Sequence, residues 1–391
     1  METGKIKHYK SNYIVTQFKT IFAITLCSIY SCTSTNEGIS NTVKMKFHES
    51  SIIATDFSDS FNSIKPESAT NDAIITNIER VLGINDRFFV VDRIGNKIIA
   101  YDKDGKFINS TTRLQGRGKG EYIRISDATI DTDDNLIFAY CDAPYQIMVY
   151  DIDLNYKYTI NLDFYAKEIA VEGNHIYTLC QSDKEGEINQ FELRCYKKND
   201  MSKYDVLLKH EKTIAGVRGF GKSMNSDGEH CYISLPFDNS IYCLDNGKIE
   251  NIWTINFNGQ WFDYEKAKIQ SKNDFFDSNK ENNWMIQNIC FSDSIIIFNT
   301  NKTGVNIMNL NSKECDYYTS IIFPFELGRS WLMPIGGMKS SFCYNISANT
   351  IVEYARFINT NNRIYKNESH KCIYDKYDSH DNPLFITAKI R

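Results

Sequence analysis

A repeated strand pattern constrains the fold of this chain more than any other feature. Residues 85–107 read as a turn, an apolar strand, a second turn and another strand, which ends in a Tyr-Asp pair at 101–102. The same order returns about fifty residues later at 134–153, with a Tyr-Asp pair at 150–151. A period of this length is typical of propellers and solenoids, in which each unit buries its faces only against its neighbours.

Composition agrees with strands as the repeating element. The chain has 391 residues, of which 24 are Tyr and 24 are Phe, and aromatic residues favour strands over helices. We predict an all-β fold, a six-bladed β-propeller of four-stranded antiparallel blades with a short helix late in the chain. Five or seven blades remain open, because the later units are more degenerate. The units are expected at residues 75–115, 125–165, 167–212, 213–258, 284–322 and 328–391.

Three segments lie outside this rhythm. Residues 41–59, with a first strand that contains Val43, Met45 and Phe47, are expected to pair with the end of the chain, since an open edge at the closing blade would be unstable. Residues 262–283 are charged and are interpreted as an insertion between two units. Residues 349–359 carry apolar side chains at helical spacing, and Ser347 is the expected N-cap of that helix.

The N-terminus resembles a bacterial lipoprotein signal. Four lysines precede an apolar stretch at 21–30, which is too short to span a bilayer, because a spanning helix needs about 20 apolar residues. The stretch ends in Ile-Tyr-Ser-Cys at 29–32, which resembles a lipobox apart from its bulky Tyr. We predict a signal peptide at 1–31, lipidation of Cys32, a polar tether at 32–42 and the propeller at 43–391. Cleavage without a lipid is the alternative.

Charge and cysteine usage exclude several classes of protein. The net charge of −5 argues against a nucleic-acid binder, which would show a basic surface. Of the 11 cysteines, Cys27 and Cys32 belong to the signal segment, and no Cys-x-x-Cys pair occurs in the sequence. The remaining odd number, set mostly within apolar runs, predicts neither a disulfide framework nor a zinc site.

Two weak metal patterns are better explained as loops. Asp131, Asp133 and Asn135 partly imitate a calcium-binding loop, but Leu136 occupies the position of the required Gly, so a hairpin turn is favoured. A cluster with His370, Cys372 and His380 lies in a polar, loop-like stretch and lacks metal-ligand spacing. We predict no metal and no cofactor.

A glycine-rich loop carries a resemblance to a known family. Residues 116–122, Gly-Arg-Gly-Lys-Gly-Glu-Tyr, resemble the Gly-x-Gly-Pro-Gly-Glu-aromatic signature of six-bladed β-propeller lipoproteins of Bacteroidetes, which are distantly similar to NHL-type propellers. Asp-Gly-Lys-Phe at 104–107, Ser-Ala-Asn at 347–349 and Asp-Asn-Pro-Leu-Phe at 381–385 extend it, while Lys119 replaces the usual Pro. The resemblance implies a propeller lipoprotein of the cell envelope, anchored at the outer membrane on its periplasmic or outer side, and implies little chemistry.

Candidate ligand-binding residues lie in the glycine loop and beside the insertions. The three alternating glycines are explained by positive φ and close packing between blades, yet the loop also presents charge at one end of the ring. Trp253 lies in a strand pattern and is expected in the core. The candidate ligand-binding residues are Arg117, Lys119, Glu121, Tyr122, Trp261, Trp284 and Trp331.

The sequence favours a binding or scaffolding module over an enzyme. No nucleophile, metal or cofactor signature stands beside the repeats, which commonly present binding faces. We expect residues 262–283 and 326–338 to cover one end of the ring and to bind a glycan, a peptide or an envelope protein there. The alternative is a carbohydrate-active hydrolase or lyase with acid and base residues at the mouth of the channel, and a structural subunit of an envelope complex is a third possibility.

Overall fold

A computed structural model describes residues 38–182, 190–214, 216–217, 221–292, 294–323, 329–330, 334–338, 341–360 and 374–390. The predicted signal peptide, Cys32 and most of the tether lie outside these ranges, as do Trp331 and His370. The fold is that of residues 38–390 alone.

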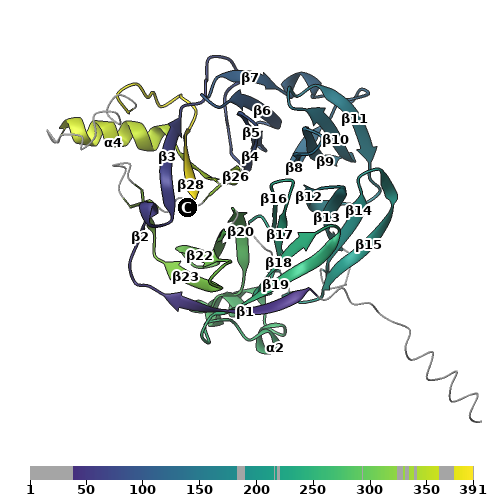
Figure 1. Cartoon of the computed structure of the whole chain (residues 1–391), viewed down its shortest axis with the longest axis vertical. Coiled ribbons are helices and arrows are strands. Elements are labelled where there is room, and N and C mark those ends of the chain that lie inside the picture. The colour runs from purple at the N-terminus through teal and green to yellow at the C-terminus, as the bar shows by residue number, and fades with distance from the viewer. Residues whose placement is uncertain are drawn as a thin grey trace, which may run out of the picture. The chain divides into compact units, whose positions relative to one another are not determined.

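Four-stranded antiparallel sheets make up most of this part, arranged as in a β-propeller (Figure 1). Successive strands of each sheet run outward from its first strand. The first sheets are β4–β7 (Arg80–Ile84, Arg87–Asp92, Lys97–Asp102, Phe107–Ser110), β8–β11 (Arg124–Asp131, Leu136–Ala143, Tyr145–Asp151, Tyr156–Asn161) and β12–β15 (Ala166–Glu172, His175–Ser182, Gln190–Lys197, Asp200–His210). Next come β16–β19 (Met224–Ser226, Cys231–Ser234, Ser240–Asp245, Lys248–Asn256) and β20–β23 (Ile286–Phe291, Ile295–Thr300, Val305–Asn309, Glu314–Tyr318).

The inner strands meet in chain order and close on themselves. β4 contacts β8, β8 contacts β12, β12 contacts β16, and β16 contacts β20. β20 contacts β26 (Gly336–Met338), which pairs in parallel with β4 and completes the circuit. Most of the hydrophobic clusters combine side chains from neighbouring sheets, for example Leu82 and Phe89 with Ile130 and Ile137. Sheets therefore bury their faces against one another, as the repeat requires.

The N-terminal strands differ from the prediction. β1 (Ile39–Phe47) begins before the predicted domain boundary and buries Val43 and Met45, but it does not pair with the chain end. Instead it pairs in parallel with β19 and then with β23, covering the edges of two sheets. The strand that pairs with the chain end is β3 (Ser58–Ile64), antiparallel to β28 (Leu384–Ile390). It completes the sheet of β26, β27 (Ser341–Ile346) and β28, because that sheet's outer edge needs a partner.

The repeated Tyr-Asp pair has a local physical cause. Tyr101 and Tyr150 are fully buried between sheets. The Asp that follows each of them closes the next turn, since Asp102 Oδ1 accepts hydrogen bonds from the backbone N–H groups two and four residues on, and Asp151 Oδ1 does the same. The pair thus marks where a buried strand ends and a turn begins.

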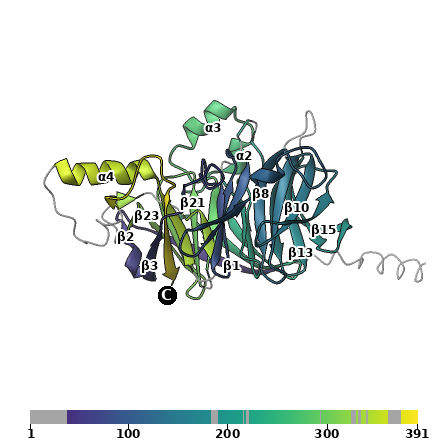
Figure 2. The same ribbon diagram turned by 90° about the horizontal axis from the view of Figure 1, so that it is seen from above.

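Helices occupy the segments that interrupt the repeat (Figure 2). α4 (Ala348–Thr360) confirms the predicted late helix, and Ser347 Oγ accepts the backbone N–H of Thr350 as an N-cap. The remaining elements are α2 (Tyr264–Ala267), α3 (Lys272–Ser278), the 3-10 turns η1 (Ala54–Asp56) and η2 (Thr112–Leu114), and a small sheet of β2 (Ile52–Ile53), β24 (Ile321–Ile322) and β25 (Arg329–Ser330). In the described ranges no helix combines the length and apolar character that crossing a membrane would take.

Candidate functional site

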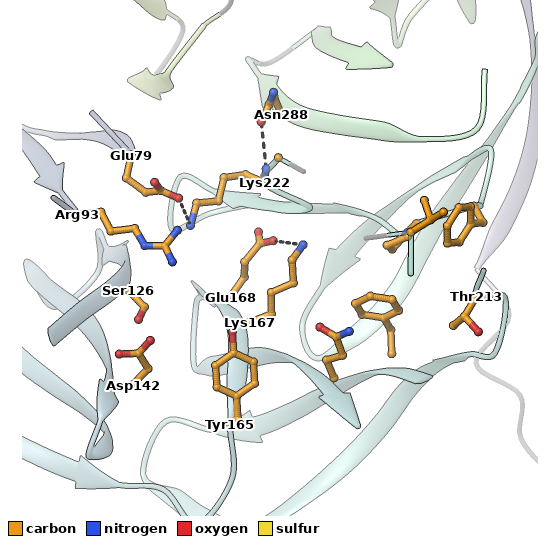
Figure 3. Close-up of a pocket in the computed structure, with 16 residues that line it drawn as sticks. Glu79, Arg93, Ser126, Asp142, Tyr165, Lys167, Glu168, Thr213, Lys222 and Asn288 are labelled. Atoms are coloured by element: carbon orange, nitrogen blue, oxygen red, sulfur yellow. Dashed lines mark hydrogen bonds and ion pairs between the residues drawn. The ribbon is translucent and has the colours of Figure 1, made fainter. Parts of the chain in front are cut away.

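A cavity of about 600 Å³ opens where the inner strands begin (Figure 3). Its volume lies within the range of about 300–1,000 Å³ that is common for small-ligand sites. Inner-strand segments supply Ser126, Lys167, Lys222 and Asn288 to its lining. Inner strands of successive sheets begin at the same end of a propeller, so side chains far apart in sequence meet there.

Beneath the cavity lies a buried ionic network on the inner strands. Arg80 of β4 lies between Asp127 of β8 and Glu168 of β12, with its Nη2 at 3.7 Å from Asp127 Oδ1 and 3.9 Å from Glu168 Oε2. All three side chains are at most 4% exposed. The same Nη2 donates a 2.7 Å hydrogen bond to the carbonyl of Met224 in β16. One arginine therefore joins four inner strands.

The carboxylates of this network also bridge one sheet to the next. Asp127 accepts the backbone N–H of Ile169 at 3.0 Å, which joins β8 to β12. Glu168 accepts the N–H groups of Ser223 and Met224, each at 2.9 Å, which joins β12 to β16. These bonds satisfy backbone donors between sheets whose inner strands do not form ladders with each other. The network therefore has a structural role, which is to join neighbouring sheets.

The cations around Glu168 keep that carboxylate ionised. Burial by itself raises the pKa of Glu168, but Lys167, Lys222 and Arg80, together with the Ser223 N–H, lower the pKa to about 2. Burial disfavours the charge of Lys222, yet Asp127 and the other nearby carboxylates leave its pKa raised. A carboxyl with so low a pKa does not donate protons near neutral pH.

All the charged side chains that line the cavity, apart from Arg93, form ion pairs with described residues. Lys222 Nζ lies 3.0 Å from Asp127 Oδ1 and 3.1 Å from Glu79 Oε1. Lys167 Nζ lies 3.0 Å from Glu168 Oε1. Arg93, in the β5–β6 turn, is exposed and directed into the cavity (Figure 3), and it has no ion pair or hydrogen bond with any residue that the structure describes.

The predicted insertion supports the apolar wall of the cavity. Phe237 lines the cavity, and its ring packs against Phe262 at 5.8 Å, Phe275 of α3 at 6.2 Å and Trp284 at 6.0 Å between ring centroids. Trp284 is only 6% exposed within this cluster. The segment that breaks the repeat thus holds one side of the cavity rather than offering a separate stacking surface.

The glycine loop has a structural explanation. The Glu121 carboxylate folds back into the loop and accepts the N–H of Gly118 at 2.6 Å. A Cβ on Gly116 would lie 2.0 Å from Glu121 Oε2, so a side chain at this position would displace the Glu121 carboxylate. Tyr122 is fully buried, and its hydroxyl bonds with Thr111 and the carbonyl of Asn96, so it belongs to the core and is not accessible to a ligand.

We expect Gly116→Ala to lower the free energy of unfolding by about 1–3 kcal/mol, because the new methyl group expels the Glu121 carboxylate from the loop. The double variant with Glu121→Ala relieves this clash, so Gly116→Ala is expected to cost clearly less in that background. Urea denaturation of the single and double variants measures the difference. An identical cost in both backgrounds would contradict the proposed role of Glu121.

The other predicted ligand residues are scattered. Lys119 and Glu121 line a second, open pocket beside β11, which is distinct in its residues from the large cavity. Arg117 is exposed and lines neither. Trp261 is partly buried against Phe257, with ring centroids 4.9 Å apart. Trp331 lies outside the described residues.

The favoured interpretation of the acidic turn at 131–135 is confirmed. Asp131 Oδ1 accepts the N–H groups of Asp133 and Asp134, and Asn135 has a φ of 55°. Lys198 Nζ lies 2.6 Å from Asp131 Oδ2, so this carboxylate is already compensated. Across the described ranges, no three His, Cys, Asp or Glu side chains are placed together to hold a metal.

Sequence reasoning missed the charged residues of the cavity and its floor. A signal was present, since Arg80, Asp127 and Glu168 each precede the apolar residues of the first strand of a unit. An ionised residue at that recurring position indicates an ionic network around the propeller axis, because the first strand of each blade faces the centre. Arg93 gave no such signal, since an arginine in a turn resembles any surface residue.

Comparison with known proteins places the chain within a family and a fold. Residues 39–389 match the family described as "Domain of unknown function (DUF4934)". A candidate exported protein from Bacteroides fragilis superposes with a TM-score of 0.66 at 14% identity, covering 90% of this chain and 100% of that one. This likeness bears on the fold alone. None of the curated proteins matches.

Two further solved structures resemble this chain more weakly. A member of the DUF4221 family from Bacteroides vulgatus gives a TM-score of 0.47 at 9% identity, covering 85% of this chain and 97% of that one. The β-propeller domain of Cps50 (Swd1) from Myceliophteria thermophila gives 0.36 at 9% identity, covering 60% and 67%. Both scores are too low to carry an argument.

Proposed function

Because the chain belongs to the DUF4934 family, whose description assigns no function, we propose a function from the site itself: a lipid-anchored binding module of the bacterial cell envelope. The cavity of about 600 Å³ at the start of the inner strands carries this proposal. It combines Arg93, which has no partner among the described residues, with an apolar wall supported by the insertion, and small-ligand sites show this mixture of polar and apolar groups. The proposed ligand is a glycan, a peptide or a segment of an envelope protein, which binds in the cavity at the end of the ring.

The proposal includes a six-bladed ring of the NHL-like type. The circuit of inner strands β4, β8, β12, β16, β20 and β26, each beginning a four-stranded group, supports this blade number. In that ring β3 is the outermost strand of the last blade, which ties the N-terminal part of the propeller to its C-terminal strand.

The proposed location rests on the N-terminal segment and on one relative. The sequence at 29–32 favours a lipid on Cys32 and attachment to the outer membrane. The Bacteroides fragilis structure that shares the fold is described as a candidate exported protein, which is consistent with a cell-envelope address. Mass spectrometry of the mature N-terminus tests the anchor, which requires a diacylated or triacylated Cys32.

Ser126→Tyr is expected to weaken ligand binding at the cavity, because a phenol ring in place of a lining serine occupies space that a ligand needs. A thermal-shift panel of oligosaccharides and peptides identifies a ligand, and calorimetry then compares the variants. We expect at least about a tenfold loss of affinity. The matched control Ser312→Tyr, at an exposed turn, should bind as the parent protein does. Equal binding by Ser126→Tyr would rule out the cavity as the site.

A carbohydrate-active hydrolase or lyase is the second candidate. One observation favours it: ionisable side chains gather at a single mouth, among them Glu79 and Asp142. Glu168 is a poor acid for this role because its pKa is lowered, so these two carboxylates are the candidates for proton transfer. Turnover of a glycan panel with defined kinetics would support the enzyme and contradict the module that only binds.

A further inference from the structure

We propose that the ligand of the large cavity is an acidic carbohydrate whose carboxylate is bound by Arg93. This inference rests on the proposed function, since it names the ligand class of the same site. It follows from the charge around the cavity, from a lining arginine that has no partner among the described residues, and from buried hydroxyl groups that have no hydrogen-bond partner among the described atoms.

The charged lining residues of the cavity balance, with three cations and three carboxylates, and their ion-pair partners leave the surroundings of the cavity with one net positive charge in an acidic protein. The charged lining residues and their ion-pair partners are five cations and four carboxylates, whereas the whole chain has a net charge of −5. The cations are Arg80, Arg93, Arg124, Lys167 and Lys222, and the carboxylates belong to Glu79, Asp127, Asp142 and Glu168. A ligand with a negative charge is therefore favoured over a neutral or basic one.

Only Arg93 is available to take that charge. Lys222 is held between Asp127 and Glu79, and turning it toward a ligand would leave the fully buried Asp127 without its closest cation. Lys167 is held by Glu168 and Ser223. Arg93 is exposed and has no partner in the described part of the chain, and its planar guanidinium can donate two parallel hydrogen bonds to one carboxylate.

The rest of the lining suits the hydroxyl groups and ring faces of a sugar. Ser126 Oγ and Thr213 Oγ1 are buried and have no hydrogen-bond partner among the described atoms, and Thr213 is only 8% exposed. Leaving a buried hydroxyl unpaired is costly, so a ligand hydroxyl would be favoured there. Thr213 lies across the cavity from Arg93 (Figure 3), and Phe191 and Phe237 provide apolar faces. A fatty acid would satisfy Arg93 but would leave both hydroxyls unpaired.

The test titrates matched acidic and neutral oligosaccharides into the mature protein and measures binding by calorimetry. One pair is galacturonan and galactan oligomers, and the other is glucuronan and glucan oligomers. We expect an acidic oligomer to bind at least about tenfold more tightly than its neutral counterpart, with affinity that falls as salt is added. Arg93→Gln should weaken that binding about 10- to 100-fold, since a charge-assisted hydrogen-bond pair is lost. Arg93→Lys, which keeps the charge, should recover part of it.

Arg117→Gln is the matched control, because Arg117 is another exposed arginine of the described surface and lies outside the cavity lining. It should leave the affinity unchanged, and the melting temperature of each variant verifies folding. Equal binding of neutral oligomers, a loss with Arg117→Gln but not with Arg93→Gln, or no binding of any acidic oligomer overturns the acidic-carbohydrate inference. If only a neutral ligand bound, and Ser126→Tyr weakened its binding, this inference alone would be overturned. If Ser126→Tyr left the binding of every ligand unchanged, the proposed function would be overturned as well.

Discussion

Arg80→Met is expected to lower the free energy of unfolding by about 3–5 kcal/mol, because it removes the cation between two buried carboxylates. Asp127 is completely buried and Glu168 is 1% exposed, so neither regains hydration in the folded state. The change also removes the hydrogen bond to the Met224 carbonyl, which ties β4 to β16. Urea denaturation followed by circular dichroism and tryptophan fluorescence measures the loss.

Arg117→Met is the matched control for this experiment. Arg117 is exposed and has no described partner, so its replacement should change the free energy of unfolding by no more than about 0.5 kcal/mol. If Arg80→Met were no more destabilising than the control, the inner-strand network would not hold the sheets together. Should Arg80→Met fail to fold, Arg80→Lys provides a milder variant whose loss should lie between the two.

Glu168→Gln is expected to remove a pH-dependent contribution to stability. The pKa of Glu168 is lowered from 4.5 to about 2 in the folded protein, chiefly because the surrounding cations outweigh the effect of burial. A lowered pKa stabilises the fold above the unfolded value, and the stabilisation is lost as the pH falls from about 4.5 to about 2. The contribution at neutral pH is about 3 kcal/mol, from roughly 1.4 kcal/mol for each pKa unit.

The measurement is the unfolding free energy of parent and variant from pH 7 to pH 2. The variant should be less stable at pH 7, and the two curves should converge as the pH falls through this window, since protonation makes Glu168 neutral as well. Glu314→Gln is the control, because Glu314 is half exposed in its ion pair with Lys46, and its loss should change the free energy of unfolding at pH 7 by no more than about 1 kcal/mol. A constant difference between parent and Glu168→Gln would contradict the assigned ionisation.

Much of the fold could be predicted from local patterns. The turn aspartates Asp102 and Asp151, the N-cap Ser347 and the apolar strands between them depend on contacts within a few residues, which a sequence displays directly. The insertion was also recognisable, because its charged residues break the strand alternation. The partner of β1 was predicted wrongly, because several sheet edges were equally open to a strand with its alternation and only tertiary packing chose between them.

The candidate site could be predicted far less well. The motif at residues 116–122 predicted Glu121 and Tyr122 as ligand-binding residues. In the structure Glu121 instead accepts the backbone N–H of Gly118, and the Tyr122 hydroxyl bonds with Thr111 in the core. The tryptophan at 284 was expected near a surface, but the insertion folds over it. Residue type alone does not separate a side chain that binds a ligand from one that holds a loop.

The sequence by itself determined that this protein repeats a strand-and-turn unit, because turn hydrogen bonds and strand alternation are local. Only the tertiary structure decided which charged residues meet. Arg80, Asp127, Glu168 and Lys222 come from four sheets, and their pairing arises when the inner strands close around one centre. The same closure leaves Arg93 at the cavity without a partner among the residues that the structure describes, because electrostatic pairing depends on distances in space that no spacing along the chain records.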